Sequence, residues 1–192
     1  MGSLGQRQAE ARRLLQAAGY GPNHPHKFTL TMRNTSDPML IYPAVQADWK
    51  DVGVQASLAP EEGQIAFADY RARNFQGADA AWIGDYNDPM TYLTLMKSTT
   101  GQQNYGDYKN PAFDALLDKA DQETDPIKRG EYLKRAERMA MEEVAVAPLY
   151  HYVSKGLVSP RLTGWVPNLA DWHRTRYLCF AGHKPPAEIA PP

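Results

Sequence analysis

Apolar positions in the first half of the chain switch between helical and strand-like spacing. Residues 9–18 carry apolar side chains three and four positions apart, which predicts a helix. Residues 28–32 and 54–58 instead alternate apolar and polar side chains, as half-buried strands do. Helices are predicted between these strands at 37–53 and after them at 64–73. This order predicts βαβ units, and therefore an α/β fold with a largely parallel sheet.

The middle of the chain predicts a third strand followed by a helix. An apolar run over residues 78–83 has strand length and closes at Gly84, whose backbone freedom suits a strand end. Asp88 and Pro89 are the residue types of an N-cap and a first helical position. Asp85 has no such structural role. In a parallel sheet it would follow the carboxyl end of a strand, where α/β proteins place ligands.

Cap-plus-proline dipeptides and β-prone runs organise the rest of the chain. Residues 37–38, 110–111 and 125–126 are Asp-Pro or Asn-Pro pairs, and each predicts a helix start. Residues 146–158 are rich in valine and tyrosine and predict one or two strands. Residues 175–180 predict a last short strand.

The composition limits the classes of protein to which the chain can belong, but it indicates no specific function. The chain has 192 residues, of which 43% are hydrophobic and 22% charged, and a formal net charge of -1, so its overall balance predicts no nucleic-acid partner. The single cysteine, Cys179, excludes an internal disulfide and is expected to be a buried strand residue. The sequence has no apolar stretch of about 18 residues and no recognisable secretory signal, so we expect no membrane insertion.

Asp85 is the candidate binding residue, because it stands between Trp82 and Tyr86. A carboxylate flanked by aromatic rings suits an ammonium group through charge-assisted hydrogen bonds and ring contacts. An ordinary turn aspartate that binds its own backbone is the alternative, and spacing alone leaves both interpretations open.

Enzyme motifs are missing from the sequence. It contains no G-x-S-x-G, H-E-x-x-H or G-x-G-x-x-G motif and no phosphate-binding loop. Asp85 and Asp88 could mimic a glycosidase carboxylate pair, but capping already accounts for Asp88. His24 and His26 could contact a metal, although an exposed loop is the simpler interpretation. We expect no catalytic residue, no metal and no cofactor.

Four segments carry motifs that occur together in one family. They are W-x-x-D-Y-x-[DE]-P at 82–89, A-x-x-L-L-x-x-A-G-Y at 9–20, N-x-x-x-Y-x-x-P-x-F-D-x-L at 104–117, and a closing segment at 147–160. In this combination the chain resembles the oligopeptide- and dipeptide-binding proteins of ABC importers, the extracellular solute-binding proteins of family 5. The resemblance implies a periplasmic-binding-protein-like lobe, with a mixed, mostly parallel sheet flanked by helices.

The resemblance also implies residue roles. Asp85 would accept the terminal ammonium of a peptide, and Tyr152 falls where the family has a ligand-contacting tyrosine. Ala81, Ile83 and Asp85 share one parity, so their backbone groups could pair with an extended peptide. Two alternatives stay open: Trp82 is either a pocket wall or a core aromatic, and the hydroxyl of Tyr152 could simply meet solvent.

Position 79 departs from the family pattern. Some oligopeptide binders carry a basic residue three positions before the tryptophan, whereas this chain has Asp79. We expect Asp79 to repel a free peptide carboxylate. The ligand class therefore stays open within the family, where an oligosaccharide, a nickel complex or an opine is the alternative to a peptide. A carboxylate-dependent hydrolase is the alternative outside the family.

The resemblance divides the chain into three parts. Residues 1–162 would form the ligand-binding C-terminal lobe, and residues 163–180 would return to an N-terminal lobe that this sequence lacks. Residues 181–192 contain four prolines and predict a mobile tail. The expected partners are a peptide, the missing lobe and, indirectly, an ABC permease with its ATPase subunits. The parent protein is expected to be periplasmic or otherwise extracytoplasmic.

Overall fold

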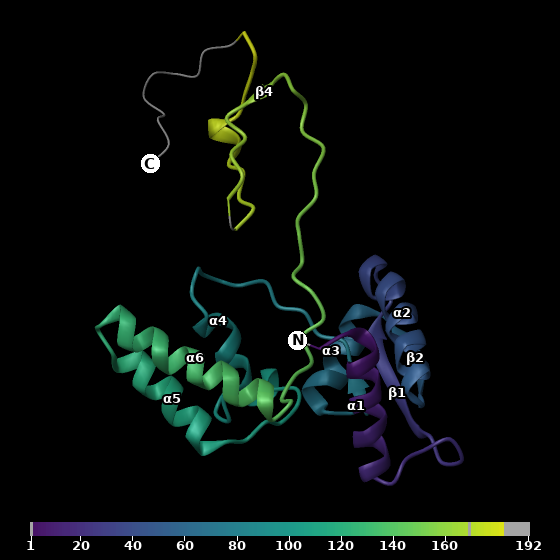
Figure 1. Cartoon of the computed structure of the whole chain (residues 1–192). Coiled ribbons are helices and arrows are strands. Elements are labelled where there is room, and N and C mark those ends of the chain that lie inside the picture. The colour runs from purple at the N-terminus through teal and green to yellow at the C-terminus, as the bar shows by residue number, and fades with distance from the viewer. Residues whose placement is uncertain (1, 169, 183–192) are drawn as a thin grey trace. The chain divides into compact units, whose positions relative to one another are not determined.

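A computed structural model describes residues 2–168 and 170–182, which divide into two compact units (Figure 1). The first unit comprises Met1–Trp82 and Leu95–Ala115, and the second comprises Ile83–Thr94 and Leu116–Pro192. No helix in the described part of the chain is long and apolar enough to cross a membrane.

The first unit is built on a parallel sheet. Its elements are α1 (Leu4–Ala17), β1 (His26–Arg33), α2 (Ser36–Val52), β2 (Val54–Glu61), α3 (Gly63–Ala72) and β3 (Gly77–Ala78). The three strands are parallel in the order β2-β1-β3, with Arg33 opposite Glu61 at the end of the β1–β2 register. The chain moves from β1 to a neighbour on one side and later to a neighbour on the other. This reversal is the kind of position where α/β sheets bind ligands.

Side-chain capping explains where α1 begins, whereas α2 begins without a side-chain cap. A capping box between Ser3 and Gln6 starts α1 earlier than the apolar spacing predicted. The predicted start of α2 at Asp37 is wrong, because Thr35 is the N-cap and Asp37 lies within the first turn. There its negative charge still favours the positive end of the helix. Gly53 ends α2 in the left-handed conformation, with φ of 97°.

The core of the first unit lies between the sheet and its helices. Apolar side chains are buried on β1, β2 and α3; they are Leu30, Met32, Val54, Ala56, Ala66 and Tyr70. The edge of Phe28 meets the ring of Trp49 on α2, with centroids 5.1 Å apart. Burial alternates along the start of β2, as predicted, whereas the middle of β1 is buried on both faces, because Thr31 is buried as well as Leu30 and Met32.

Three α-helices contribute to the second unit, whose described part otherwise consists largely of irregular chain. It contains α4 (Met90–Leu93), the greater part of α5 (Pro111–Gln122), and α6 (Pro126–Glu142), with α4 packed against α6. Helices α5 and α6 run in opposite directions in Figure 1. Asn110 and Asp125 accept backbone hydrogen bonds at the starts of α5 and α6, so these two predicted starts are confirmed.

The end of the chain contains less strand than the sequence predicts. Only β4 (Leu162–Thr163) and β5 (Cys179–Phe180) pair, in antiparallel fashion, and the turn η3 (Thr175–Tyr177) replaces most of the predicted last strand. Cys179 is half-buried on β5 rather than buried. The predicted mobile tail lies, from residue 183 onward, outside the described residues.

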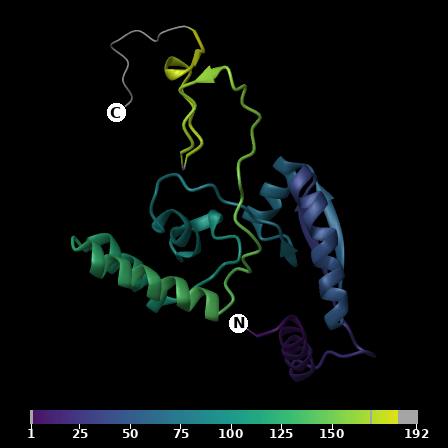
Figure 2. The same cartoon turned by 45° about the horizontal axis from the view of Figure 1, so that its top comes forward.

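The strand prediction for residues 146–158 is wrong. These residues have no secondary structure, and every residue from 146 to 161 is exposed. Figures 1 and 2 show the segment as an extended trace before β4. A β-prone sequence becomes a strand only when a neighbouring strand satisfies its backbone groups, and no such neighbour exists among the described residues.

The third strand is also shorter than predicted, since β3 comprises only two residues. The amide of Asp79 still donates to the Thr31 carbonyl, 3.0 Å away, in continuation of the ladder. The next amide on β1, that of Arg33, donates instead to the carboxylate of Asp79 at 2.8 Å. A side chain therefore takes the place of a strand carbonyl and ends the pairing.

Candidate functional site

Asp85 lies exposed in the loop between β3 and α4. Its amide donates to the hydroxyl oxygen of Thr91 at 3.0 Å, and that hydroxyl donates to Oδ2 of Asp85 at 3.4 Å. No lysine or arginine in the described ranges forms an ion pair with Asp85. The loop is therefore held in place by α4, while the carboxylate keeps most of its capacity to accept hydrogen bonds.

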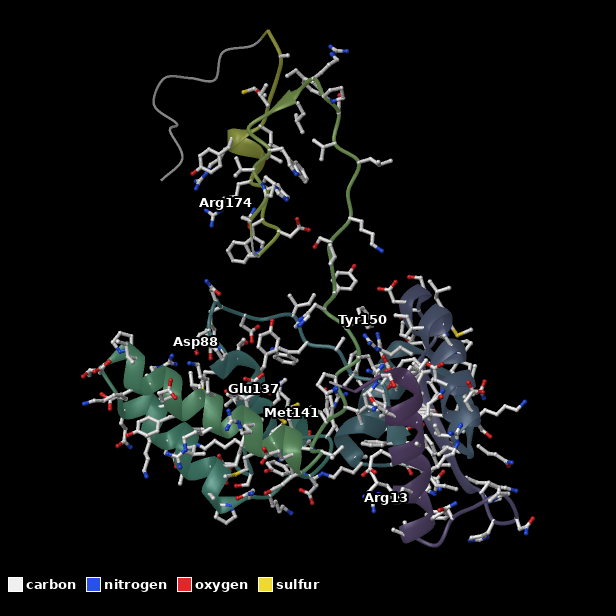
Figure 3. The ribbon with its side chains drawn as sticks, in the orientation of Figure 1. Arg13, Asp88, Glu137, Met141, Tyr150 and Arg174 are labelled. Carbon is white, nitrogen blue, oxygen red and sulfur yellow. The ribbon has the colours of Figure 1, made fainter. Side chains whose placement is uncertain are left out.

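The predicted N-cap at Asp88 is wrong by one residue, because Pro89 is the N-cap and α4 begins at Met90, but Asp88 still binds the start of the helix. Oδ1 of Asp88 accepts a hydrogen bond from the Met90 amide at 2.9 Å. Figure 3 labels the side chain of Asp88. Both carboxylate oxygens also bind Arg129 of α6, at 2.5 and 2.9 Å. The hydrogen bond from Arg129 holds the pKa of Asp88 below its ordinary value. Asp88 thus joins α4 to α6, and its charge is compensated within the unit.

The neighbours of Asp85 in sequence differ in exposure. Ile83 and Tyr86 are 79% and 55% exposed, and Ala81 is exposed as well. Trp82 is half-buried. Residues 79–83 belong to no strand, so a peptide pairing with Ala81 and Ile83 would meet backbone that lies outside the sheet ladder. The binding roles of these residues stay predictions.

Tyr152 lies in the exposed segment before β4 and is itself 65% exposed. The strand end on which it was expected is missing. No contact between Tyr152 and Asp85 occurs among the described interactions, so their joint action on a ligand stays a prediction.

Asp79, which was expected to repel a peptide carboxylate, is a buried and paired charge. It is 1% exposed, and Oδ2 accepts hydrogen bonds from Nε and Nη2 of Arg33 at 2.9 and 2.6 Å. The hydroxyl of Tyr70 donates to Oδ1 at 2.6 Å. Burial, followed by the hydrogen bond to Asp79, raises the pKa of Tyr70 far above its ordinary value, so the phenol stays protonated. The expected repulsion of a peptide carboxylate by Asp79 is wrong, because Arg33 neutralises this charge.

The histidines at the amino end of β1 form an aromatic group. The ring of Tyr20 lies 5.7 Å from that of His24 and 4.6 Å from that of His26, measured between centroids. These three side chains line a shallow surface hollow. Within the described residues, no group of three or more histidine, cysteine or acidic side chains could hold a metal ion.

The first unit is an α/β unit with a parallel sheet. Residues 4–104, more than half of the chain, match the model of the bacterial extracellular solute-binding proteins, family 5 Middle. The chain belongs to this family. The resemblance and the fold class stated from the sequence are thereby confirmed.

Named relatives share the family. The chain is 36% identical over 174 residues to the periplasmic murein peptide-binding protein MppA of Escherichia coli, covering 88% of this chain and 32% of the relative. It is 36% identical over 161 residues to the periplasmic oligopeptide-binding protein OppA of Salmonella typhimurium, covering 83% and 29% respectively. The solved structure of the E. coli murein tripeptide binding protein MppA matches with a TM-score of 0.86 at 34% identity, over 95% of this chain and 36% of that one. The chain thus spans about a third of the length of these proteins.

Proposed function

We propose that this chain is the C-terminal lobe of a two-lobe extracytoplasmic solute-binding protein, which captures peptides and delivers them to an ABC permease with its ATPase subunits. The peptide-binding names of both relatives, and their periplasmic location, support this assignment. The share of each relative that the chain covers supports a second lobe elsewhere in the parent protein. No catalytic step belongs to the proposal, in keeping with a family described as solute-binding proteins.

The exposed carboxylate of Asp85 is the main observation that supports the proposal. Its carboxylate is exposed, is supported by Thr91 and lacks a cationic partner among the described residues. An uncompensated carboxylate on a positioned loop suits a peptide's terminal ammonium, and enclosure by a second lobe would strengthen the ion pair by expelling water. Trp82, Tyr86 and Tyr152 would supply aromatic walls around the ligand.

The segments around β4 and β5 support a missing lobe. Trp172 and Phe180 are 69% and 58% exposed, and residues 146–161 are exposed throughout. Trp165 is less exposed, at 37%, and its ring stacks on that of His173, with centroids 3.5 Å apart. Exposed apolar side chains on this scale are typical of surfaces that another part of a protein covers. Residues 163–180 would therefore lie on the other lobe.

A double comparison of protein and peptide tests the role of Asp85. Calorimetry on the complete binding protein would compare tri-alanine with N-acetylated tri-alanine, using the unmodified protein, Asp85→Asn and the control Glu131→Gln. Glu131 is an exposed carboxylate on α6 that pairs with Lys134. We expect acetylation to weaken binding to the unmodified protein and to Glu131→Gln by tenfold or more, and to have less than a twofold effect on Asp85→Asn.

Two results would contradict the proposal. Asp85→Asn could distinguish the two peptides as sharply as the unmodified protein does, which would remove the ammonium contact. Peptides of any kind could fail to bind while an oligosaccharide, an opine or a nickel complex binds, which would change the ligand class. The isolated chain is expected to bind weakly, because half of the enclosure and the closing motion are missing.

A further inference from the structure

Three charged side chains lie where the strands of the first unit end. Arg33 is the last residue of β1 and Glu61 the last of β2, and the two are opposite each other in the register. Asp79 follows β3 directly. Tyr70 of α3 joins them through its hydrogen bond to Asp79. Because all three strands are parallel, this is the carboxyl edge of the sheet, the edge at which α/β folds bind ligands.

The charges at this edge do not balance. Arg33 is paired with Asp79, which occupies two of its nitrogens. Tyr70 is neutral, because its phenol stays protonated. Glu61 is close enough to act electrostatically on Tyr70. The group formed by Arg33, Tyr70, Asp79 and Glu61 therefore retains one negative charge, that of Glu61.

Glu61 lacks the contacts that normally satisfy a partly buried carboxylate. Its Oε2 atom is buried and has no hydrogen-bond partner among the described residues. The nearby amino end of α3 does not satisfy it, because the amides of Gln64 and Ile65 bind Glu62 instead. An unsatisfied acceptor of this kind is uncommon in native structures and costly to maintain. Oε2 itself is closed to solvent, but the residue as a whole is only half-buried, so the rest of its side chain is open to a ligand group.

We propose that the carboxyl edge of this sheet is a subsite for a positively charged group of the ligand, an ammonium or a guanidinium, with Glu61 as its counter-charge. This inference rests on the proposed peptide-binding function and specifies its substrate class: peptides that carry a lysine or arginine side chain. The Arg33–Asp79 pair keeps the arginine away from Glu61 and so preserves the negative charge of the subsite. Asp79 thus acts here as a positioning residue rather than as a ligand contact.

Isosteric peptides test this subsite in the complete binding protein. Calorimetry would compare tri-alanine derivatives in which position 2 or position 3 is lysine, norleucine or glutamate. Norleucine keeps most of the apolar length of lysine and removes the charge. We expect the lysine peptide to bind at least tenfold tighter than the norleucine peptide at one of the two positions, and the glutamate peptide to bind weakest. This preference should weaken as the salt concentration rises.

The variant Glu61→Gln removes the charge and keeps the shape. We expect it to reduce the lysine preference to less than twofold and to leave the affinity for tri-alanine within twofold. The matched control is Glu10→Gln, which removes the same charge from an exposed position on α1 and should leave the preference unchanged. A thermal melt of each variant shows whether it is folded.

The possible outcomes distinguish failure of the cation subsite from failure of the proposed function. Equal affinities for lysine and norleucine at both positions would overturn the cation subsite without touching the proposed function, and this comparison needs no variant. A lysine preference that survives in Glu61→Gln would also overturn it. Failure of every peptide to bind the unmodified protein would overturn the proposed function and the subsite together.

Discussion

Asp79 and Asp85 follow the same short strand in sequence, yet their surroundings are opposites. Asp79 is 1% exposed and receives hydrogen bonds from Arg33 and Tyr70. Asp85 is exposed and receives one long hydrogen bond from the hydroxyl of Thr91. A buried carboxylate with two partners contributes to stability, because its removal leaves those partners buried without their hydrogen bonds. An exposed carboxylate without a cation contributes little to stability and remains available to a ligand. Substitution of Asp79 is therefore expected to lower stability, whereas substitution of Asp85 is expected to affect ligand binding.

The largest expected effect is that of Asp79→Asn on stability. The substitution leaves the Arg33 guanidinium without its counter-charge in a site where it is mostly buried, which costs about 3–5 kcal/mol of unfolding free energy. Urea unfolding of this chain, followed by circular dichroism, measures the difference. Arg33→Met in the Asp79→Asn background should recover part of the loss, because it removes the stranded charge. A loss below about 1 kcal/mol for Asp79→Asn would show that the buried pair is not what stabilises this edge.

Tyr70→Phe should have a smaller effect, of about 1–2 kcal/mol, because it removes one buried hydrogen bond and keeps the ring. The pKa of Tyr70 is raised in the folded state, so its protonated form stabilises the fold below the ordinary value of 10.0. This contribution is lost progressively as the pH rises above that value. The stability difference between the unmodified chain and Tyr70→Phe should therefore shrink between about pH 9 and pH 11. A difference that stays constant over this range would contradict the assignment.

Asp88→Asn should cost about 1 kcal/mol, because the pair with Arg129 is partly exposed and therefore screened by solvent. The pKa of Asp88 is lowered in the folded state, so its contribution is present above the ordinary value of 3.8 and is lost as the pH falls below it. Unfolding free energies at pH 7 and pH 3 measure this, and the two proteins should converge at the lower pH. Glu131→Gln is the control, since its exposed pair should contribute less than about 0.5 kcal/mol.

Asp85→Asn should change the unfolding free energy least, by less than about 0.5 kcal/mol, because no ion pair of the described residues depends on it. The same variant is expected to lose its sensitivity to peptide acetylation. A destabilisation comparable to that of Asp79→Asn would erase the contrast between the two aspartates and assign Asp85 a structural role.

The sequence predicted the structural features that depend on residues close to one another along the chain. The alternation at the start of β2 and the caps at Asn110 and Asp125 were readable because burial parity and capping act within a few residues. The alternation predicted for residues 28–32 located β1 but not its burial, since Thr31 is buried too. Arg33 and Asp79 are 46 residues apart, and Asp88 and Arg129 are 41 apart, so no local pattern joins them. An arginine at the end of an apolar strand was the available signal for the first pair. The strand prediction for residues 146–158 failed for a related reason, since a strand needs a neighbour that local sequence does not supply.

The exposed stretch from residue 146 to residue 161 has a practical consequence. Extended backbone without hydrogen-bonded neighbours fits readily into a protease active site, so brief digestion of this chain should cut there before it cuts the helices. Tyr150, Tyr152 and Lys155 offer chymotrypsin and trypsin their preferred side chains in this stretch. In the proposed two-lobe protein, slower cleavage of this stretch would indicate that the other lobe covers it.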